Sequence, residues 1–366
     1  MVADADVLVL LLTSYPRRYR QPYGMHLILD NCMFGRQMET EHVISFLLHA
    51  QPSHGAEEPE VLPIVGPGRV GKTTLVTHVC KDERVRDRFA EIVLLTDLQF
   101  TDAELAALGQ RCSSVRNGNN RGSNSNSRDG KFLIVVEVAG DFNEDAWSRL
   151  YSAPKRWAPL GSKIIVTSRS DKITKVGTAR PLKFLPREAY WYFFRTLAFG
   201  GADPGAHPGL ASMAMEVAGS TDWAFISAHI TARVLRGNLD ARFWGKVLAL
   251  YREFVGQHGS RFGGNPFATL NQDGPALLGR MGGPAFADLM IHHHYECSSP
   301  SEVPDVMTVQ ELMFGSEVVR AQGKFQFVWT SPIPPHYSHI YTCEILGRKS
   351  AAAKRKRSGG NDVALS

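Results

Sequence analysis

The stretch VLPIVGPGRVGKTT, residues 61–74, decides how the rest of the chain is interpreted. A short apolar run ends at Gly66, and Gly71-Lys72-Thr73 follows after four intervening residues. Apolar residues then recur at helical spacing. This order predicts a strand, a glycine-rich turn and a helix, with the phosphate-loop pattern G-x-x-x-x-G-K-[ST] on the turn. Pro63 conflicts with the strand, because a central strand disfavours proline.

Each position of the phosphate-loop pattern has its own chemistry. Glycines let backbone N–H groups approach an anion closely, and the following helix offers its unpaired N–H groups to the same anion. Lys72 supplies a positive charge for the β- and γ-phosphates, and the Thr73 hydroxyl can bind Mg²⁺. The alternative is a glycine turn before an ordinary helix. We predict nucleotide binding by the residues of this loop, which are Gly66, Pro67, Gly68, Arg69, Val70, Gly71, Lys72, Thr73 and Thr74.

The composition is that of an ordinary globular protein, with 366 residues of which 43% are hydrophobic and 21% charged. The net charge of +5 comes from six basic residues near the end of the chain, between Arg348 and Arg357. Without them, 35 basic residues stand against 36 acidic ones, so we expect no direct nucleic-acid binding by the folded part. Five scattered cysteines without C-x-x-C indicate a reducing compartment. The apolar run at residues 6–12 is too short to span a membrane.

Two more apolar runs predict buried parallel strands that end in polar residues. One runs through residues 132–137 and ends in Glu137, and the other runs through residues 163–169 and ends in Arg169. Strands of this kind alternating with helical stretches predict an α/β fold with a doubly wound parallel sheet. Ligands of such sheets bind beyond the carboxyl ends of the strands, where Gly66, Glu137 and Arg169 all fall.

The second half of the chain changes character and predicts a small helical domain. Its apolar periodicity favours helices at residues 188–199, 207–218, 225–236 and 240–254. Strand-like patterns follow at residues 308–312, 325–329 and 339–345. The run His-His-His-Tyr-Glu-Cys at residues 292–297 suggests zinc, but no second ligand pair stands at zinc spacing.

These composition shifts divide the chain into five parts. The phosphate-loop domain contains a Ser-, Asn- and Gly-rich segment at residues 113–130 that we expect to be a disordered loop. The parts are an N-terminal segment 1–32, the phosphate-loop domain 33–185, a helical subdomain 186–256, an unassigned region 257–345 and a basic disordered tail 346–366.

The order of these motifs resembles the nucleotide-binding domain of plant intracellular immune receptors, the NB-ARC class of STAND P-loop ATPases. The resemblance covers about residues 33–250, and the chain is similar to divergent, truncated members from grasses. It implies ADP or ATP as cofactor with Mg²⁺, Arg36 beside the adenine, Arg169 as a phosphate sensor, and Thr73 with Glu137 at the metal. It rests on the phosphate loop and on residues 33–39 (MFGRQME), 132–138, 161–169 (GSKIIVTSR) and 182–199.

The sequence also departs from that family. Val138 stands where the family has a second acid, and neither a Gly-Leu-Pro-Leu block near residues 219–221 nor a Met-His-Asp block is found. We recognise no leucine-rich repeat. No catalytic residue can be assigned, and we expect at most a weak ATPase, because valine cannot orient the attacking water.

The resemblance implies a nucleotide-dependent switch in plant defence with protein partners in immune signalling. Two alternatives stay open: a degenerate scaffold or decoy that binds little nucleotide, and a P-loop ATPase or small-molecule kinase. The expected location is the cytoplasm. The basic residues at 354–357 favour a nuclear localisation signal, with a solvated, disordered basic end as the alternative.

Overall fold

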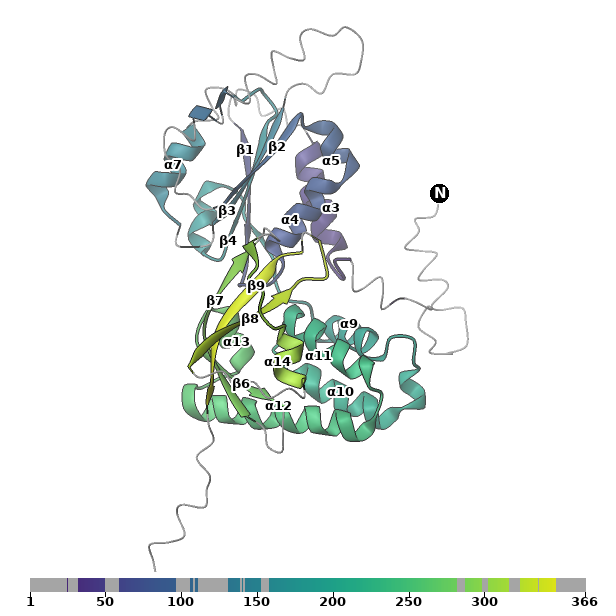
Figure 1. Cartoon of the computed structure of the whole chain (residues 1–366). Helices are drawn as coiled ribbons and strands as arrows, with labels where there is room; N and C mark the ends of the chain where they lie inside the picture. The colour runs from purple at the N-terminus through teal and green to yellow at the C-terminus, as the bar shows by residue number, and fades with distance from the viewer. Residues whose placement is uncertain are drawn as a thin grey trace, which may run out of the picture.

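The structure of the protein is a computed structural model (Figure 1). An α/β unit is followed by a group of helices that pack with a second sheet. None of the helices in the described part of the chain combines the length and the apolar character needed to cross a membrane. The described residues are 25, 32–49, 59–96, 106–107, 109–110, 131–138, 140, 142–152, 158–281, 287–297, 302–315, 323–334 and 336–346.

The first sheet is parallel, with its five strands in the order β2-β3-β4-β1-β5. Strands β3 and β4 are buried along almost their whole length, as expected when helices cover both faces of a parallel sheet. The predicted fold class is therefore confirmed. In that spatial order the strands are Glu91–Thr96, Phe132–Val138, Lys163–Ser168, Glu60–Val65 and Arg180–Pro181.

Helices cover both faces of this sheet, and each face has its own hydrophobic cluster (Figure 1). One face packs against α3, α4 and α5, and the opposite face packs against α7. The carboxyl edge of the sheet, where the phosphate loop lies, points toward the second half of the chain (Figure 1). The four helices are Gln37–Leu48, Lys72–Lys81, Glu83–Arg88 and Glu144–Ser152.

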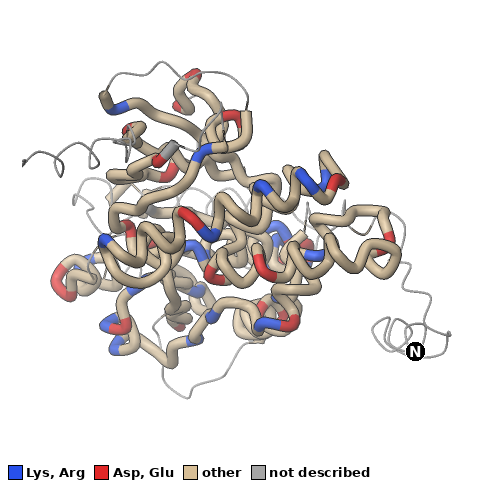
Figure 2. Tube along the Cα trace, turned by 90° about the horizontal axis from the view of Figure 1, so that it is seen from below, with Lys and Arg blue, Asp and Glu red and all other residues tan. Residues whose placement is uncertain are grey.

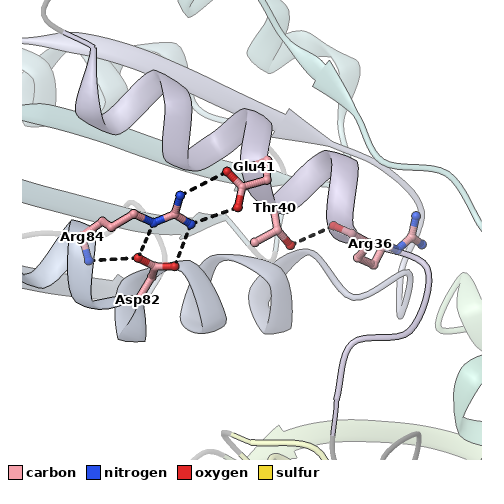
Figure 3. A network of polar contacts seen from close by, with 5 residues as sticks. All are labelled: Arg36, Thr40, Glu41, Asp82 and Arg84. Atoms are coloured by element: carbon pink, nitrogen blue, oxygen red, sulfur yellow. Dashed lines mark hydrogen bonds and ion pairs between the residues drawn. The ribbon is translucent and has the colours of Figure 1, made fainter. Parts of the chain in front are cut away.

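Helix α3 is tied to the start of α5 by one arginine (Figure 3). The Arg84 guanidinium donates to both carboxylate oxygens of Glu41, at 2.9 and 3.3 Å, and to both oxygens of Asp82, at 3.0 Å each. Asp82 also caps α5 by accepting from the Arg84 backbone N–H. These groups are largely solvated, so the network positions α3 more than it stabilises the fold. Arg36 lies at the start of the same helix α3.

Pro63 fits in β1 because, among the described residues, no strand pairs with it on one side. The Val65 carbonyl accepts from Leu182 N–H on the β5 side, and strand alternation turns the backbone of Pro63 to the same side. Strand β5 pairs only with Ile64 and Val65, so the missing N–H of Pro63 breaks no bond of the sheet.

The second half of the chain joins helices and an antiparallel sheet around one hydrophobic core (Figure 1). Trp244 and Phe254 of α12 and Phe327 of β8 are among its fully buried members. The helices are α9 Arg187–Phe199, α10 Pro208–Ser220, α11 Phe225–Gly237, α12 Ala241–Phe262, α13 Pro266–Asn271 and α14 Val309–Phe314. The sheet order is β6-β7-β9-β8, with bounds Ala276–Arg280, Ala287–Cys297, Ser338–Leu346 and Lys324–Thr330.

Two sequence-based element predictions are corrected here. The helix predicted to end at residue 254 continues to Phe262, because residues such as His258 are buried against the core and this packing outweighs the low helix propensity of Gly256 and Gly259. The strand predicted at residues 308–312 is instead helix α14, which begins with a capping box formed by Thr308 and Glu311. Strands β8 and β9 confirm the other two predicted strands.

Charges of both signs are interspersed along the described chain (Figure 2). The expected disordered loop at residues 113–130, the basic tail and nearly all of the N-terminal segment lie outside the described residues.

Candidate functional site

The phosphate loop runs from the end of β1 to the start of α4 in a tight turn. Gly71 has φ +93°, a left-handed conformation that glycine adopts without strain. Arg69 also has a positive φ, +58°, although it is not glycine. Gly66 lies so close to the neighbouring backbone that a Cβ there would overlap the Leu182 carbonyl oxygen. The loop therefore turns its backbone to the first turn of α4, where unpaired N–H groups can meet an anion.

The Lys72 side chain is buried and folds back over the loop. Its ammonium donates to the carbonyl oxygens of Gly66, at 2.9 Å, and Pro67, at 2.8 Å. Burial first, and then the positive charge of Arg169, lower the pKa of Lys72 to about 8. Without an anion, backbone carbonyls thus compensate this charge, and a phosphate would be a stronger partner for it.

The side chains of Thr73 and Glu137 are in direct contact at the carboxyl edge of the first sheet. The Thr73 hydroxyl, in the first turn of α4, donates a hydrogen bond to a carboxylate oxygen of Glu137 at the end of β3. A hydroxyl beside a carboxylate is a pair of hard oxygen donors, which is the set that Mg²⁺ prefers. These two residues therefore fit the metal that accompanies nucleotides in phosphate-loop proteins.

Arg169 lies just beyond the carboxyl end of β4, against the phosphate loop. A Cβ on Gly68 would be 3.3 Å from its Cζ atom. Its guanidinium forms an ion pair with Asp273, in the turn after α13, and donates a hydrogen bond to that carboxylate. The sequence-based interpretation, in which Arg169 reaches toward a terminal phosphate, did not include this carboxylate.

Arg36 is buried, and its Nη2 group binds two backbone carbonyl oxygens. It donates to the carbonyl oxygens of Val70, at 3.2 Å, and Lys183, at 2.7 Å, and it pairs with Glu39 at 3.0 Å. Its Cζ atom lies 5.8 Å from the ring centre of Phe225. Arg36 therefore joins the phosphate loop to the segment before α9, and an adenine could contact its guanidinium at the cavity wall but would share it with these carbonyls.

A cavity with about 1060 Å³ of empty space, part of it open to solvent, joins these groups. Its wall comes from three parts of the chain: the phosphate-loop unit, helices α9 and α11, and the second sheet. Of the predicted site residues, Gly66, Pro67 and Gly68 do not line it. Those that do are Arg36, Arg69, Val70, Gly71, Lys72, Thr73, Thr74, Glu137 and Arg169.

The second sheet contributes residues that the sequence-based prediction of the site missed. Glu296 on β7 faces the loop cations, and burial followed by the charge of Glu137 raises its pKa to about 7. Burial and then Arg69 lower the pKa of His339 on β9 to about 3, and its Nδ1 is buried without a hydrogen-bond partner in the structure. Tyr337 and Trp329 also line the cavity. The sequence offered one signal for these residues, which is the acidic Glu296 within the histidine-rich run at residues 292–297.

The histidine-rich run lies in strand β7, where successive side chains point to opposite faces, so its histidines have different partners. The Nε2 atom of His292 lies 3.4 Å from Glu344 Oε2, and the Nε2 atom of His293 lies 3.2 Å from Thr342 Oγ1. The Nε2 atom of His294 lies 3.3 Å from Asp273 Oδ1. A break in the register of β7 and β9 occurs between Ile291 and His293. Among the described residues, no group of three or more His, Cys, Asp or Glu side chains is placed to hold a metal ion.

Val138 lines the cavity and also packs in the apolar cluster beneath α7. It offers no oxygen to a water molecule. Asp141, an acid three residues further along the chain, lies outside the described residues.

Comparison with known proteins agrees with the motifs. Residues 36–203 match the NB-ARC domain family. Disease resistance protein RGA2 of Solanum bulbocastanum is 24% identical over 238 residues, which cover 59% of this chain and 23% of that protein. Disease resistance RPP13-like protein 4 of Arabidopsis thaliana is 26% identical over 155 residues, which cover 39% of this chain and 18% of that protein. The chain thus spans about a quarter or less of the length of these relatives.

Among solved structures, a RuvB variant of Thermotoga maritima aligns with 72% of this chain and 94% of its own, at 13% identity and a TM-score of 0.40. So low a score adds nothing to the fold assignment, which rests on the strand order and the phosphate loop. The resemblance stated from the motifs is confirmed by the family match and the sequence relatives. In its residues 36–203 the chain carries an NB-ARC domain of the kind found in plant disease resistance proteins.

Proposed function

We propose that the chain is an ADP- and ATP-binding switch of the NB-ARC type that acts in plant defence. The observation that carries the proposal is the composition of the cavity wall, to which the phosphate-loop unit, the helices and the second sheet all contribute. A nucleotide bound there would contact all three parts. If its affinity differs between two arrangements of those parts, it will shift their populations, and that is the requirement for a switch.

The phosphate end of the nucleotide would lie over the loop. Lys72 and the N–H groups at the start of α4 would hold the β-phosphate. Thr73 and Glu137 would hold Mg²⁺, which neutralises phosphate charge when it is bound. The base would lie at the more apolar end of the cavity, which Phe34 and Phe225 line, near the Arg36 guanidinium.

Weak or absent ATP hydrolysis is part of the proposal, because Val138 provides no acceptor for the attacking water. The alternative of a scaffold that binds little nucleotide is weakened by the hydrogen bond between Thr73 and Glu137. That pair places two oxygen donors side by side at the loop, which a pure scaffold does not need. A small-molecule kinase would need a base for its acceptor beside the γ-phosphate.

The decisive experiment is to denature purified protein and identify the released nucleotide by chromatography. We expect ADP or ATP at near one molecule per chain, and its loss in Lys72→Ala. Lys81→Ala is the matched control, because Lys81 is an exposed lysine on the same helix. No released nucleotide, together with no binding of added ADP, would support the scaffold. Steady phosphate transfer to an acceptor would support the kinase.

Location and partners are also proposed here. We propose protein partners in immune signalling, in line with the disease-resistance names of the relatives. A cytoplasmic location is in line with the five scattered cysteines, and the basic residues at 354–357 suggest passage into the nucleus. A fluorescent fusion that lacks residues 354–357 should lose nuclear enrichment, and an unchanged distribution would retire the nuclear signal.

A further inference from the structure

The Arg169–Asp273 ion pair connects two parts of the chain that are 104 residues apart. Arg169 follows β4 of the first sheet, and Asp273 lies in the turn between α13 and β6. Their side chains are 38% and 39% exposed, so both remain accessible to solvent. Arg169 lines the same cavity as Lys72 and Thr73. The pair therefore lies at the edge of the proposed phosphate site.

The turn that carries Asp273 is built to touch the phosphate loop. Gly274 N–H donates to Thr269 O at 2.9 Å, and Asp273 N–H donates to Leu270 O at 3.1 Å. Asp273 has φ +60°, a conformation in which aspartate is enriched. The carbonyl oxygen of Asn271 approaches the loop so closely that a Cβ on Gly68 would overlap it. The phosphate loop, Arg169 and this turn are therefore all in contact with one another.

The other carboxylate oxygen of Asp273 also has a neighbour in the second sheet. The Nε2 atom of His294 lies 3.3 Å from Asp273 Oδ1. Burial, followed by the charge of Arg69, lowers the pKa of His294 to about 4. His294 is therefore neutral near pH 7 and leaves the negative charge of Asp273 to be balanced by Arg169.

A carboxylate and a phosphate compete for the same guanidinium, because arginine binds either of them through parallel N–H donors. With the β-phosphate at Lys72 as proposed, ATP would place a terminal phosphate at this edge of the site, and ADP would not. The negative charge of Asp273 would also repel a γ-phosphate brought beside it. Asp273 should therefore disfavour ATP and leave ADP almost unaffected.

We propose that Asp273 is a specificity-determining residue, whose carboxylate occupies Arg169 and makes binding of a third phosphate compete with the contact between the α13–β6 turn and the phosphate loop. The inference rests on the proposed nucleotide binding at this cavity. It assigns the choice between ADP and ATP to a residue outside the NB-ARC match at residues 36–203.

The test is the ratio of ADP and MgATP dissociation constants, measured by calorimetry on the full chain. Asp273→Asn should bind MgATP roughly threefold to tenfold more tightly, the range for a partly exposed ion pair plus one like charge removed. ADP affinity should stay within about twofold of wild type, because ADP does not reach the pair. Glu216→Gln is the matched control, because it breaks a similarly exposed pair, with Arg252 at 2.7 Å, away from the cavity.

A double-mutant cycle identifies Arg169 as the route of the effect. Arg169→Ala alone should weaken ATP more than ADP. Adding Asp273→Asn to it should change the ratio much less than in the wild-type background, because only the like-charge repulsion is left to remove. The inference is overturned if Asp273→Asn leaves the ratio of the ADP and MgATP dissociation constants unchanged. It is also overturned if Asp273→Asn raises MgATP affinity by the same factor when Arg169 is replaced by alanine. In both cases ADP binding by the wild type would still support the proposed function. If the wild type binds neither nucleotide, both fail. Asp273→Ser should repeat the result, which guards against a folding defect in one variant.

Discussion

The hydroxyl of Thr73, at the start of α4, donates a hydrogen bond to the carboxylate of Glu137, at the end of β3. These residues are 64 positions apart, and the parallel sheet brings them to one edge. A nucleotide with its metal would find both oxygen donors already adjacent, so little rearrangement is needed for binding.

The first prediction concerns the metal. Glu137→Gln keeps an acceptor for Thr73 but removes the charge that would face Mg²⁺. We expect the Mg²⁺-dependent part of ATP affinity to fall roughly tenfold to a hundredfold, since contacts to charged groups contribute about 1.5–3 kcal/mol. Calorimetry gives the ATP dissociation constant with Mg²⁺ and with EDTA, and the difference between the two is the Mg²⁺-dependent part. Glu144→Gln on α7, an exposed carboxylate paired with Lys175, should change nothing. An equal loss with EDTA would contradict the metal role.

Lys72 should hold the β-phosphate. Lys72→Ala should weaken ADP binding by roughly one to two orders of magnitude, the loss expected when a charge-assisted contact of ~1.5–3 kcal/mol is removed. Titration with a fluorescent ADP analogue measures this, with Lys81→Ala as the control on the same helix. If both variants bind like wild type, Lys72 is only a buried helix lysine.

The lowered pKa of Lys72, about 8, gives ADP binding a pH dependence. The ammonium that attracts phosphate is charged below this value and neutral above it. Affinity should therefore be full near pH 7 and decline as pH rises through about 8 and beyond. The decline should be absent in Lys72→Ala, which has no titrating group at this position. A flat profile in the wild type would show that the lysine stays charged.

ATP hydrolysis should be barely above background in the wild type, because Val138 supplies no base. Val138→Asp should gain single-turnover rate, since a positioned base contributes roughly 10²–10⁴-fold. Val138 is buried, so burying a carboxylate also lowers stability, and the melting temperature must be followed in parallel. Ready turnover by the wild type with no gain in the variant would assign the base to another residue, such as Glu137 or Asp141.

Glu296 should make stability depend on pH. Burial, followed by Glu137, raises its pKa in the folded chain to about 7, above the ordinary glutamate value near 4.5. The folded state therefore disfavours the ionised form, and this penalty is present above pH 7 and vanishes toward pH 4.5. Glu296→Gln should raise the melting temperature by roughly 1–3 °C at pH 8 and hardly at all at pH 5.

The control for Glu296 is Glu188→Gln on α9, an exposed carboxylate. Glu188→Gln should change the melting temperature by the same small amount at pH 5 and at pH 8. A gain for Glu296→Gln that is the same at pH 5 and pH 8 would mean that packing, and not ionisation, causes the effect.

The sequence by itself determined the phosphate-loop unit and its fold class. Strand, glycine turn and helix follow from local patterns within residues 61–74. The carboxyl ends of parallel strands share one edge, so the closeness of Gly66, Glu137 and Arg169 could be predicted without coordinates. The presence of Pro63 in β1 could not be explained from the sequence, because it depends on β5 being too short to pair with that residue.

Only the tertiary structure decided what lies opposite the loop. Glu296 and His339 line the cavity opposite the loop because an antiparallel sheet pairs β7 with β9 and shares a core with α12. Asp273 reaches Arg169 from the turn between α13 and β6. No local pattern encodes these contacts, because strand register and docking depend on side chains far apart in sequence. For the same reason α12 continues through glycines that its own sequence would end on: the packing energy of a buried face exceeds the local preference of a few residues.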